Sequence, residues 1–205
     1  MPHHHDPGAP RDRHGNPADL DAYVARLTGP DRDVWQRPDE VVAALGVEVG
    51  QSVADIGAGP GYFTLRLARA VGAHGRVFAV EVEAELIGLL QRRIVEARLG
   101  NVTAIPAREA DALLPAASCD RILVVDTFHH FPDGVAYLRH LAGALKPGGV
   151  LANVDFHRRE TPVGPPLEHR VAREDFLAAA DRAGLAVMEE KTFLPYQYFV
   201  LMRPS

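Results

Sequence analysis

Cysteine is nearly absent from this chain. Its 205 residues include one cysteine, Cys119. A disulfide within the chain is therefore excluded, and so are metal clusters and redox pairs that are built from cysteine. Scarce cysteine is typical of proteins from a reducing compartment, so we expect a cytoplasmic protein.

Long apolar runs are missing too. No segment approaches the ~20 consecutive apolar residues that a membrane-spanning helix requires, so we expect no membrane span. Residues 1–17 hold four prolines and two glycines and lack the apolar segment of a secretory signal, so they predict a disordered tail. We interpret His3, His4 and His5 as part of that tail or of a tag, and we predict no metal site.

The chain has no excess of positive charge either. Lys and Arg number 22 against 27 Asp and Glu, which gives a formal net charge of −5. A nucleic-acid partner is therefore not expected. Apolar residues make up 47% of the chain and charged residues 24%, which is ordinary for one globular domain with a full hydrophobic core.

Three parts are expected along the chain. After the tail, residues 18–50 predict an N-terminal helical cap, with a helix at 20–27 begun by Asp19, a loop at 30–38 and a helix at 38–46. Residues 51–205 predict one further domain, because β-rich runs and helical segments alternate through it. The β-rich runs are 52–56, 76–82, 101–106, 119–127, 150–156, 186–194 and 197–203.

Such alternation predicts a parallel sheet with helices on both faces. The last two runs are separated only by Pro195 and Tyr196, so they must pair antiparallel. Residues 146–149, KPGG, are expected as a turn. In sheets of this kind ligands bind beyond the carboxyl ends of the strands, which is where the first run meets a glycine-rich turn.

That turn reads VADIGAGPGYF and alternates three glycines, Gly57, Gly59 and Gly61. A Walker phosphate loop would need a lysine after Gly61, and a dinucleotide fingerprint would need a glycine where Tyr62 stands. Asp55 would repel a pyrophosphate but tolerate an ammonium or a sulfonium group. Glu81, at the end of the second run, can accept hydrogen bonds from ribose hydroxyls, which indicates an adenosine ligand without saying which one.

Three segments together resemble the class I S-adenosylmethionine-dependent methyltransferases of the type 11 or UbiE-like group. They are VADIGAGPGYFTLRLARAVGAHGRVFAVEV, RILVVDTFHHFPD and LKPGGVLANVDF, and the resemblance extends over residues 38–204. It implies a Rossmann-like, doubly wound seven-stranded sheet, mostly parallel with an antiparallel last strand. It also implies S-adenosyl-L-methionine as cofactor, with S-adenosyl-L-homocysteine as product. The cofactor-binding residues that it implies are Asp55, Gly57, Ala58, Gly59, Gly61, Glu81, Val82, Glu109, Ala110, Asp111 and Asp126.

The segment that the resemblance places at the edge of the adenine ring departs from the usual pattern of this family. Where a Gly-Asp pair is common, this chain has READALLP. Either Glu109 or Asp111 could accept a hydrogen bond from the adenine amino group, and the sequence leaves both open.

His129 and His130, on the loop after the fourth strand, are the candidate catalytic residues. Histidine titrates near neutral pH, so either could remove a proton from the methyl acceptor. The alternative is that one of them is a packing residue under the loop.

Four residues are candidates for contact with the acceptor. Trp35, with Arg32 and Gln36 beside it, could close over the site or could simply dock the N-terminal segment on the sheet. Tyr62 could contact cofactor or acceptor, or face the core. His157 and Arg158 begin a basic loop, 157–173, that suits a lid for an anionic acceptor or is merely solvated.

The sequence therefore predicts methyl transfer to an unidentified, small-molecule acceptor. Arsenite is disfavoured because its methylation uses several cysteines. A non-catalytic protein that keeps the cofactor fold, or an NAD(P)-dependent oxidoreductase, are the alternatives. The acceptor, its nucleophilic atom and the oligomeric state stay open.

Overall fold

The computed structural model describes residues 20–205, which form a seven-stranded sheet in the order β3-β2-β1-β4-β5-β7-β6. Strands β1 to β5 are parallel, and β7 lies antiparallel between β5 and β6. This confirms the predicted Rossmann-like, doubly wound α/β fold. The strands are β1 (Ser52–Ile56), β2 (Arg76–Glu81), β3 (Val102–Pro106), β4 (Cys119–Val125), β5 (Leu145–Phe156), β6 (Leu185–Lys191) and β7 (Gln197–Pro204).

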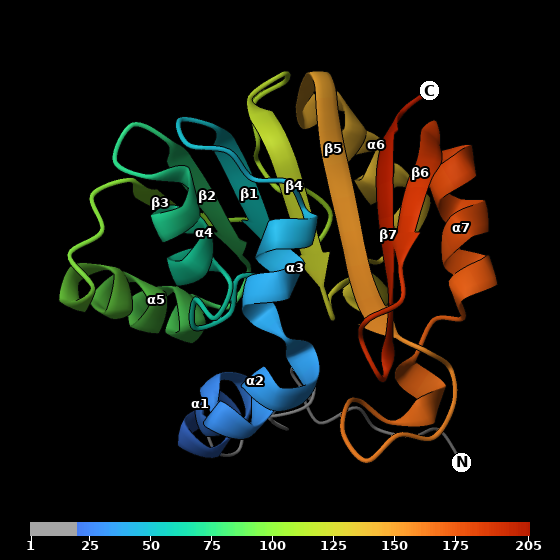
Figure 1. Cartoon of the computed structure of the whole chain (residues 1–205), viewed down its shortest axis with the longest axis horizontal. Helices are drawn as coiled ribbons and strands as arrows, with labels where there is room; N and C mark the ends of the chain where they lie inside the picture. Colours follow the sequence, from blue (N-terminus) through green and yellow to red (C-terminus); the bar gives the residue numbers. More distant parts are fainter. Residues whose placement is uncertain (1–19) are drawn as a thin grey trace, which may run out of the picture.

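Helices cover both faces of the sheet. α3, α4 and α5 pack on one face and α6 and α7 on the other, while α1 and α2 lie at the carboxyl ends of the parallel strands (Figure 1). Their bounds are α1 (Leu20–Thr28), α2 (Pro30–Gln36), α3 (Pro38–Ala44), α4 (Thr64–Val71), α5 (Ala84–Glu96), α6 (Gly134–Ala144) and α7 (Arg173–Arg182), with short 3-10 turns η1 (Phe128–His130) and η2 (Leu167–His169).

The apolar patterns explain where these elements lie. Helix α4 buries Leu67, Ala68 and Val71, which share one helical face, against the sheet. The central strand β4 is buried on both faces, as its continuous apolar run predicts. Cys119, the first residue of β4, is fully buried, and burial raises the pKa of its thiol.

Helix α2 was not expected, because residues 30–38 were predicted as a loop. Gly29 is extended, Pro30 occupies the first turn with Asp31 and Asp33, and Arg37 ends the helix in a left-handed conformation before Pro38. Proline and acidic residues favour a helix start, so the two prolines delimit a short helix rather than break one.

Two turns also differ from the sequence prediction. Residues 146–149 belong to β5, which starts at Leu145 beside Cys119 and passes through a register shift, with Gly148 at φ +78°. This segment is thus a strand irregularity rather than a turn. The connection between β6 and β7 spans residues 192–196, longer than the two-residue reversal that was predicted.

The strand order places a binding site between β1 and β4. The chain moves from β1 outward to β2 and β3, and then returns to the other side of β1 with β4. Ligands of doubly wound sheets bind at this reversal, outside the carboxyl ends of the strands. Asp19, the histidines at 3–5 and the 1–17 tail lie outside the described residues. Within residues 20–205, no helix is long and apolar enough to cross a membrane.

Candidate active site

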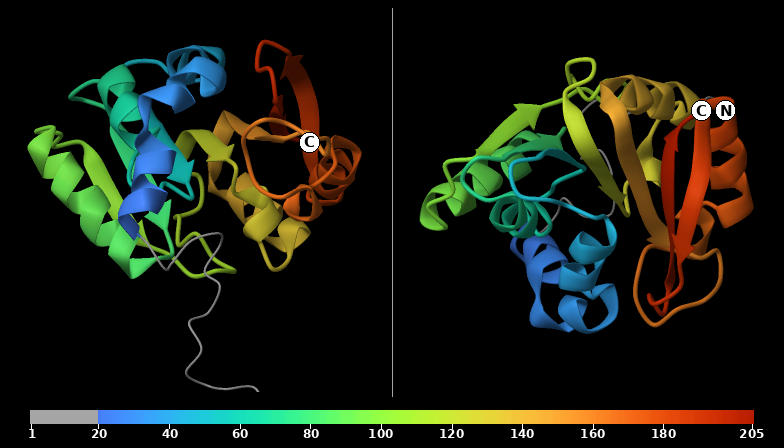
Figure 2. Two further views of the ribbon diagram at one scale, coloured as in Figure 1. Left: turned by 90° about the horizontal axis from the view of Figure 1, so that it is seen from below. Right: turned by 45° about the horizontal axis from the view of Figure 1, so that its top comes forward.

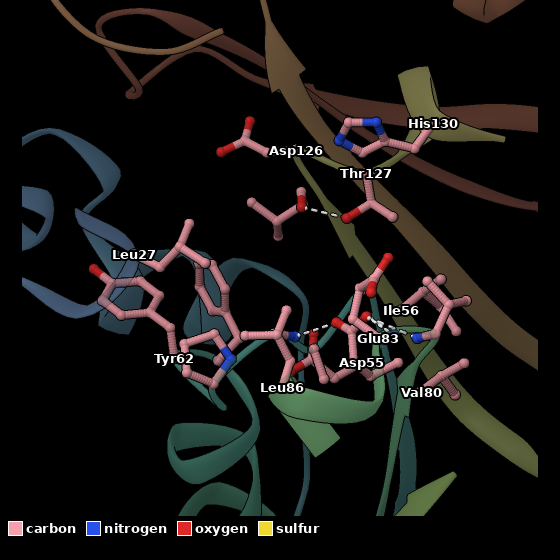
Figure 3. A pocket seen from close by; sticks show the side chains of 18 of the residues that line it. Leu27, Asp55, Ile56, Tyr62, Val80, Glu83, Leu86, Asp126, Thr127 and His130 are labelled. Carbon is pink, nitrogen blue, oxygen red and sulfur yellow. Dashed lines mark hydrogen bonds between the residues drawn. The ribbon is translucent and has the colours of Figure 1, made fainter. Parts of the chain in front are cut away.

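A cavity of about 240 Å³ opens where the strand order reverses. In Figure 3, Asp126 and His130 lie on one side of it, Val80 and Leu86 on another, and Leu27 and Tyr62 on a third. Ten predicted site residues line it, namely Asp55, Gly57, Ala58, Gly59, Tyr62, Glu81, Val82, Glu109, Asp126 and His130. The sequence therefore located the cavity well, although several predicted residues lie elsewhere.

The glycine turn brings backbone to the cavity wall. The amides of Gly57 and Ala58 both donate to the carbonyl of Val80, at 2.9 and 3.0 Å, which ties the turn to β2. Gly57 has φ +71°, and a Cβ there would lie 2.6 Å from Thr127 Cγ2 and closer still to its Oγ1. Gly61 does not line the cavity; a Cβ at Gly61 would meet Leu90 Cδ1 at 2.8 Å, so this glycine permits packing against α5.

Glu81 holds the turn in place. Its Oε2 accepts from the Gly59 amide at 2.8 Å, and its Oε1 accepts from the amides of Val82 and Glu83 at 2.7 and 3.0 Å. A carboxylate has about four lone-pair sites, so one acceptor site remains on Oε2 for a ligand. The sequence predicted that Glu81 binds ribose hydroxyls. The structure leaves Glu81 free to accept a hydrogen bond from one such hydroxyl rather than from two.

A Glu81→Gln variant tests the ribose contact. Alanine would remove the acceptor of three backbone amides, whereas glutamine keeps the side-chain shape. We expect S-adenosylhomocysteine to bind more weakly, by about 1.5–3 kcal/mol, because a charged acceptor is lost. Calorimetric titration measures it, with Glu83→Gln, on the same rim, as the control. An unchanged affinity in a folded Glu81→Gln protein would reject the ribose assignment.

Asp55 is a buried acid at the floor of the cavity. The Thr64 hydroxyl donates to its Oδ2 at 2.6 Å. Burial, with Glu81 adding to it and the Thr64 hydrogen bond opposing it, raises the pKa of Asp55 to about 6. A cation bound beside Asp55 would restore its ionised form, which suits the ammonium contact that the sequence predicts.

Asp126 lies at the tip of β4 in a left-handed conformation, with φ +50°. Gln197 Nε2 donates to its Oδ1 at 2.7 Å, and Arg32 Nη2 lies 3.7 Å from its Oδ2. Burial and the nearby Asp155 carboxylate raise the pKa of Asp126. A strained conformation together with a perturbed acid is typical of a functional position.

The two candidate histidines divide between cavity and core. His130 lines the cavity, whereas His129 does not. His129 Nδ1 lies 3.4 Å from Oδ2 of the fully buried Asp155, and the rings of His129 and His130 are 4.0 Å apart. Burial alone would lower the pKa of His129, but Asp155 outweighs it and the pKa is raised. This geometry favours His130 for contact with an acceptor and His129 for support beneath it.

The structure distinguishes between the two acids that the sequence left as alternatives for binding the adenine amino group. Glu109 lines the cavity, whereas Ala110 and Asp111 do not. Asp111 Oδ1 accepts from the Leu113 amide at 2.8 Å and lies 3.2 Å from His140 Nε2. The geometry thus favours Glu109 over Asp111 for the adenine amino group.

Among the candidate acceptor residues only Tyr62 lines the cavity. Trp35 instead packs on Phe156, with ring centroids 5.5 Å apart, because α2 docks on the end of β5. His157 packs edge-on against Tyr198, and Arg158 is exposed. Neither residue lines the cavity. In Figure 2 the N-terminal helices stand between loop 157–172 and α5. The proposed anion-binding lid is therefore not supported.

The sequence analysis did not predict several apolar residues that line the cavity, and it did not identify Arg32 as a lining residue. The apolar residues are Leu27, Phe63, Leu86, Phe131 and Tyr137. Leu27 follows from the apolar face of α1, whereas Phe131 and Tyr137 gave no signal that separates them from core. Arg32, considered only as a neighbour of Trp35, reaches the cavity directly. In the part of the chain that the structure describes, no group of three metal-ligating side chains forms.

Comparison with known proteins finds similarity to methyltransferases. The model of a family described as "Methyltransferase domain" matches residues 53–149. The chain is 27% identical over 146 residues to the ubiquinone/menaquinone biosynthesis C-methyltransferase UbiE of Cellvibrio japonicus, covering 71% of this chain and 58% of that protein. It is 26% identical over 128 residues to a demethylmenaquinone methyltransferase of Listeria monocytogenes, covering 62% and 53%. The chain thus spans little more than half the length of these relatives.

A solved structure extends the similarity to nearly the whole chain. The crystal structure of a SAM-dependent methyltransferase from Aquifex aeolicus superposes with a TM-score of 0.84 and 27% identity, covering 90% of this chain and 97% of that one. The cofactor of this family is S-adenosylmethionine rather than a nicotinamide. Residues 53–149 thus match a methyltransferase domain, and nearly the whole chain has the fold of the class I S-adenosylmethionine-dependent methyltransferases.

Proposed function

We propose that this chain transfers the methyl group of S-adenosylmethionine to a small, neutral acceptor with a hydroxyl-activated aromatic ring, such as a hydroquinone. One observation carries the proposal: a single cavity joins an acidic end, built from β1 and β2, to an aromatic end that contains His130. When bound, S-adenosylmethionine supplies the methyl group and the leaving thioether.

The residues present fit this cofactor. Six carboxylates line the cavity, and the cofactor carries positive charge on its sulfonium and its amino group. The glycine turn leaves the backbone of residues 57–59 open to close approach, since a Cβ at Gly57 would collide with Thr127. Glu81 keeps one acceptor site for the ribose, and Val82 stands beside it on the cavity wall. The acids are Asp55, Glu81, Glu83, Glu85, Glu109 and Asp126.

The opposite end of the cavity favours an uncharged, ring-shaped acceptor. Phe131 and Tyr137 supply stacked aromatic walls there, while Tyr62 and Phe63 line the cavity beside the glycine turn. An anionic acceptor would face the excess of carboxylates, and the basic loop beginning at residue 157 does not line the cavity. His130 can take the proton of an acceptor hydroxyl, and this raises the nucleophilicity of the oxygen or of the adjacent ring carbon.

The names of the relatives indicate which acceptor to try first. Two of them are named for menaquinone or ubiquinone synthesis, and one as a C-methyltransferase. A reduced naphthoquinone with one unsubstituted ring carbon is therefore the first probe.

The test compares two acceptors on the same protein. The protein is incubated with S-adenosylmethionine and either this naphthohydroquinone or its ring-methylated counterpart. We expect S-adenosylhomocysteine and a product 14 mass units heavier, a CH₂ increment, only with the unmethylated ring. Formation from both would indicate oxygen as the nucleophile. Formation from neither, in a protein that binds S-adenosylhomocysteine, would overturn the proposed acceptor and favour the non-catalytic alternative.

A further inference from the structure

The charges around the cavity are strongly unequal. Six carboxylates line it, and among the described residues Arg32 is the one lysine or arginine that does. S-adenosylmethionine, however, carries a carboxylate on its methionine moiety as well as two positive groups. A ligand carboxylate placed among six protein carboxylates without a cation would be repelled. The position of Arg32 therefore decides where that group can lie.

Contacts with neighbouring residues hold the Arg32 side chain at the cavity wall. Its Nη1 donates to the carbonyl of Leu27 at 2.9 Å, and its Nη2 donates to Gln36 Oε1 at 3.2 Å. The guanidinium carbon lies 4.2 Å from the centre of the Tyr62 ring. The side chain is 10% exposed, so the charge is partly desolvated and its attraction for an anion is strong. These contacts fix the direction of the guanidinium before any ligand arrives.

We propose that Arg32 binds the carboxylate of the cofactor's methionine moiety, an inference that rests on the proposed function. Tyr62 directly follows Gly61, so the guanidinium stacks on the end of the same turn that presents Gly57 and Gly59 to the ligand. Asp55 and Asp126 flank the same region and suit the positive amino group. Opposite charges of protein and ligand then alternate along the methionine.

The contact with Asp126 does not account for Arg32 by itself. The separation of 3.7 Å is longer than the 2.7–2.9 Å of a charge-assisted hydrogen bond. Asp126 also accepts directly from Gln197 at 2.7 Å, and Gln197 in turn accepts from Gln36 at 2.7 Å. The glutamine pair thus already joins α2 to β4 and β7, and a ligand carboxylate can compete for the guanidinium.

The test removes the carboxylate from the ligand and the guanidinium from the protein. Calorimetry measures binding of S-adenosylhomocysteine and of its decarboxylated form, S-adenosyl-3-thiopropylamine, to wild type, Arg32→Gln and Arg66→Gln. Arg66 is the matched control, because it lies 4.5 Å from the same Tyr62 ring and does not line the cavity. These two binding affinities can be measured without turnover and without knowing the acceptor.

We expect wild type and Arg66→Gln to bind S-adenosylhomocysteine about 10- to 100-fold more tightly than the amine, since a charge-assisted hydrogen bond is lost with the carboxylate. In Arg32→Gln that preference should vanish while affinity for the amine stays within about twofold. Equal weakening of both ligands would show that Arg32 only supports α2 and would overturn the inference. So would equal binding of both ligands by wild type, a result that needs no variant to fold. If the wild-type protein bound neither ligand, the proposed function itself would be overturned, and the inference about Arg32 with it.

Discussion

Replacing His130 by alanine should lower kcat for the accepted hydroquinone by about 10²- to 10⁴-fold, the usual contribution of a positioned general base. His130 lines the cavity, and the ring of His129 packs behind it with its Nδ1 3.4 Å from Asp155 Oδ2. Affinity for S-adenosylhomocysteine should stay unchanged, because the histidine lies at the acceptor end. Single-turnover rates with saturating acceptor, paired with calorimetry, separate the two effects.

A neighbouring variant serves as the comparison for this result. His129→Gln keeps a side-chain donor near Asp155 and leaves His130 in place. If His130 is the base, this change should cost far less activity than His130→Ala. Raising the pH should partly rescue His130→Ala, because a larger fraction of the acceptor hydroxyl is then already ionised. Wild-type turnover in His130→Ala would remove the base from the mechanism and point to an acceptor that arrives already ionised.

Replacing Gly57 by alanine should lower the free energy of unfolding by on the order of 2–4 kcal/mol and abolish measurable cofactor binding. The residue would hold a left-handed conformation, which costs about 1–2 kcal/mol, and its Cβ would also overlap Thr127. Thr127 cannot yield cheaply, because its hydroxyl donates to the Val125 carbonyl at 2.7 Å.

Gly184→Ala is the matched control for Gly57→Ala. Gly184 has φ +80°, but nothing lies within 4 Å of a Cβ built there. It should therefore cost only the conformational strain, about 1–2 kcal/mol, with no loss of cofactor affinity. Denaturant titration gives both unfolding energies. Equal losses in the two variants would show that the contact between Gly57 and Thr127 is unimportant.

The fold followed from the sequence because local and long-range signals agreed in it. The alternation of apolar strands with amphipathic helices fixed the sheet, and the turn beside Asp55 fixed the location of the cavity. Helix α2 was missed because residues 30–38 were predicted as a loop. Pro30 in fact begins a short helix, which ends before Pro38, the residue expected to open the next helix. Short helices give little periodic signal, so capping residues must be weighed instead.

Side-chain direction was the part of the site that spacing did not determine. His129 and His130 are adjacent in the chain, yet only His130 lines the cavity. Trp35 and Arg32 share helix α2, yet Trp35 packs on Phe156 while Arg32 reaches the cavity. Glu81 was expected to accept hydrogen bonds from ribose hydroxyls, and the structure adds three backbone amides that donate to it. Such choices depend on tertiary contacts that no short motif encodes.

The single thiol, at the first residue of β4, can be used to measure the stability of the protein. Cys119 is fully buried and burial raises its pKa, so thiol reagents will modify it only in molecules that have opened globally. With one thiol in the chain, each opened molecule gains a single mass increment. Ligands that bind the native state should slow this modification by the factor 1 + [L]/Kd, so mass spectrometry of unmodified protein would rank candidate cofactors and acceptors without any engineered probe.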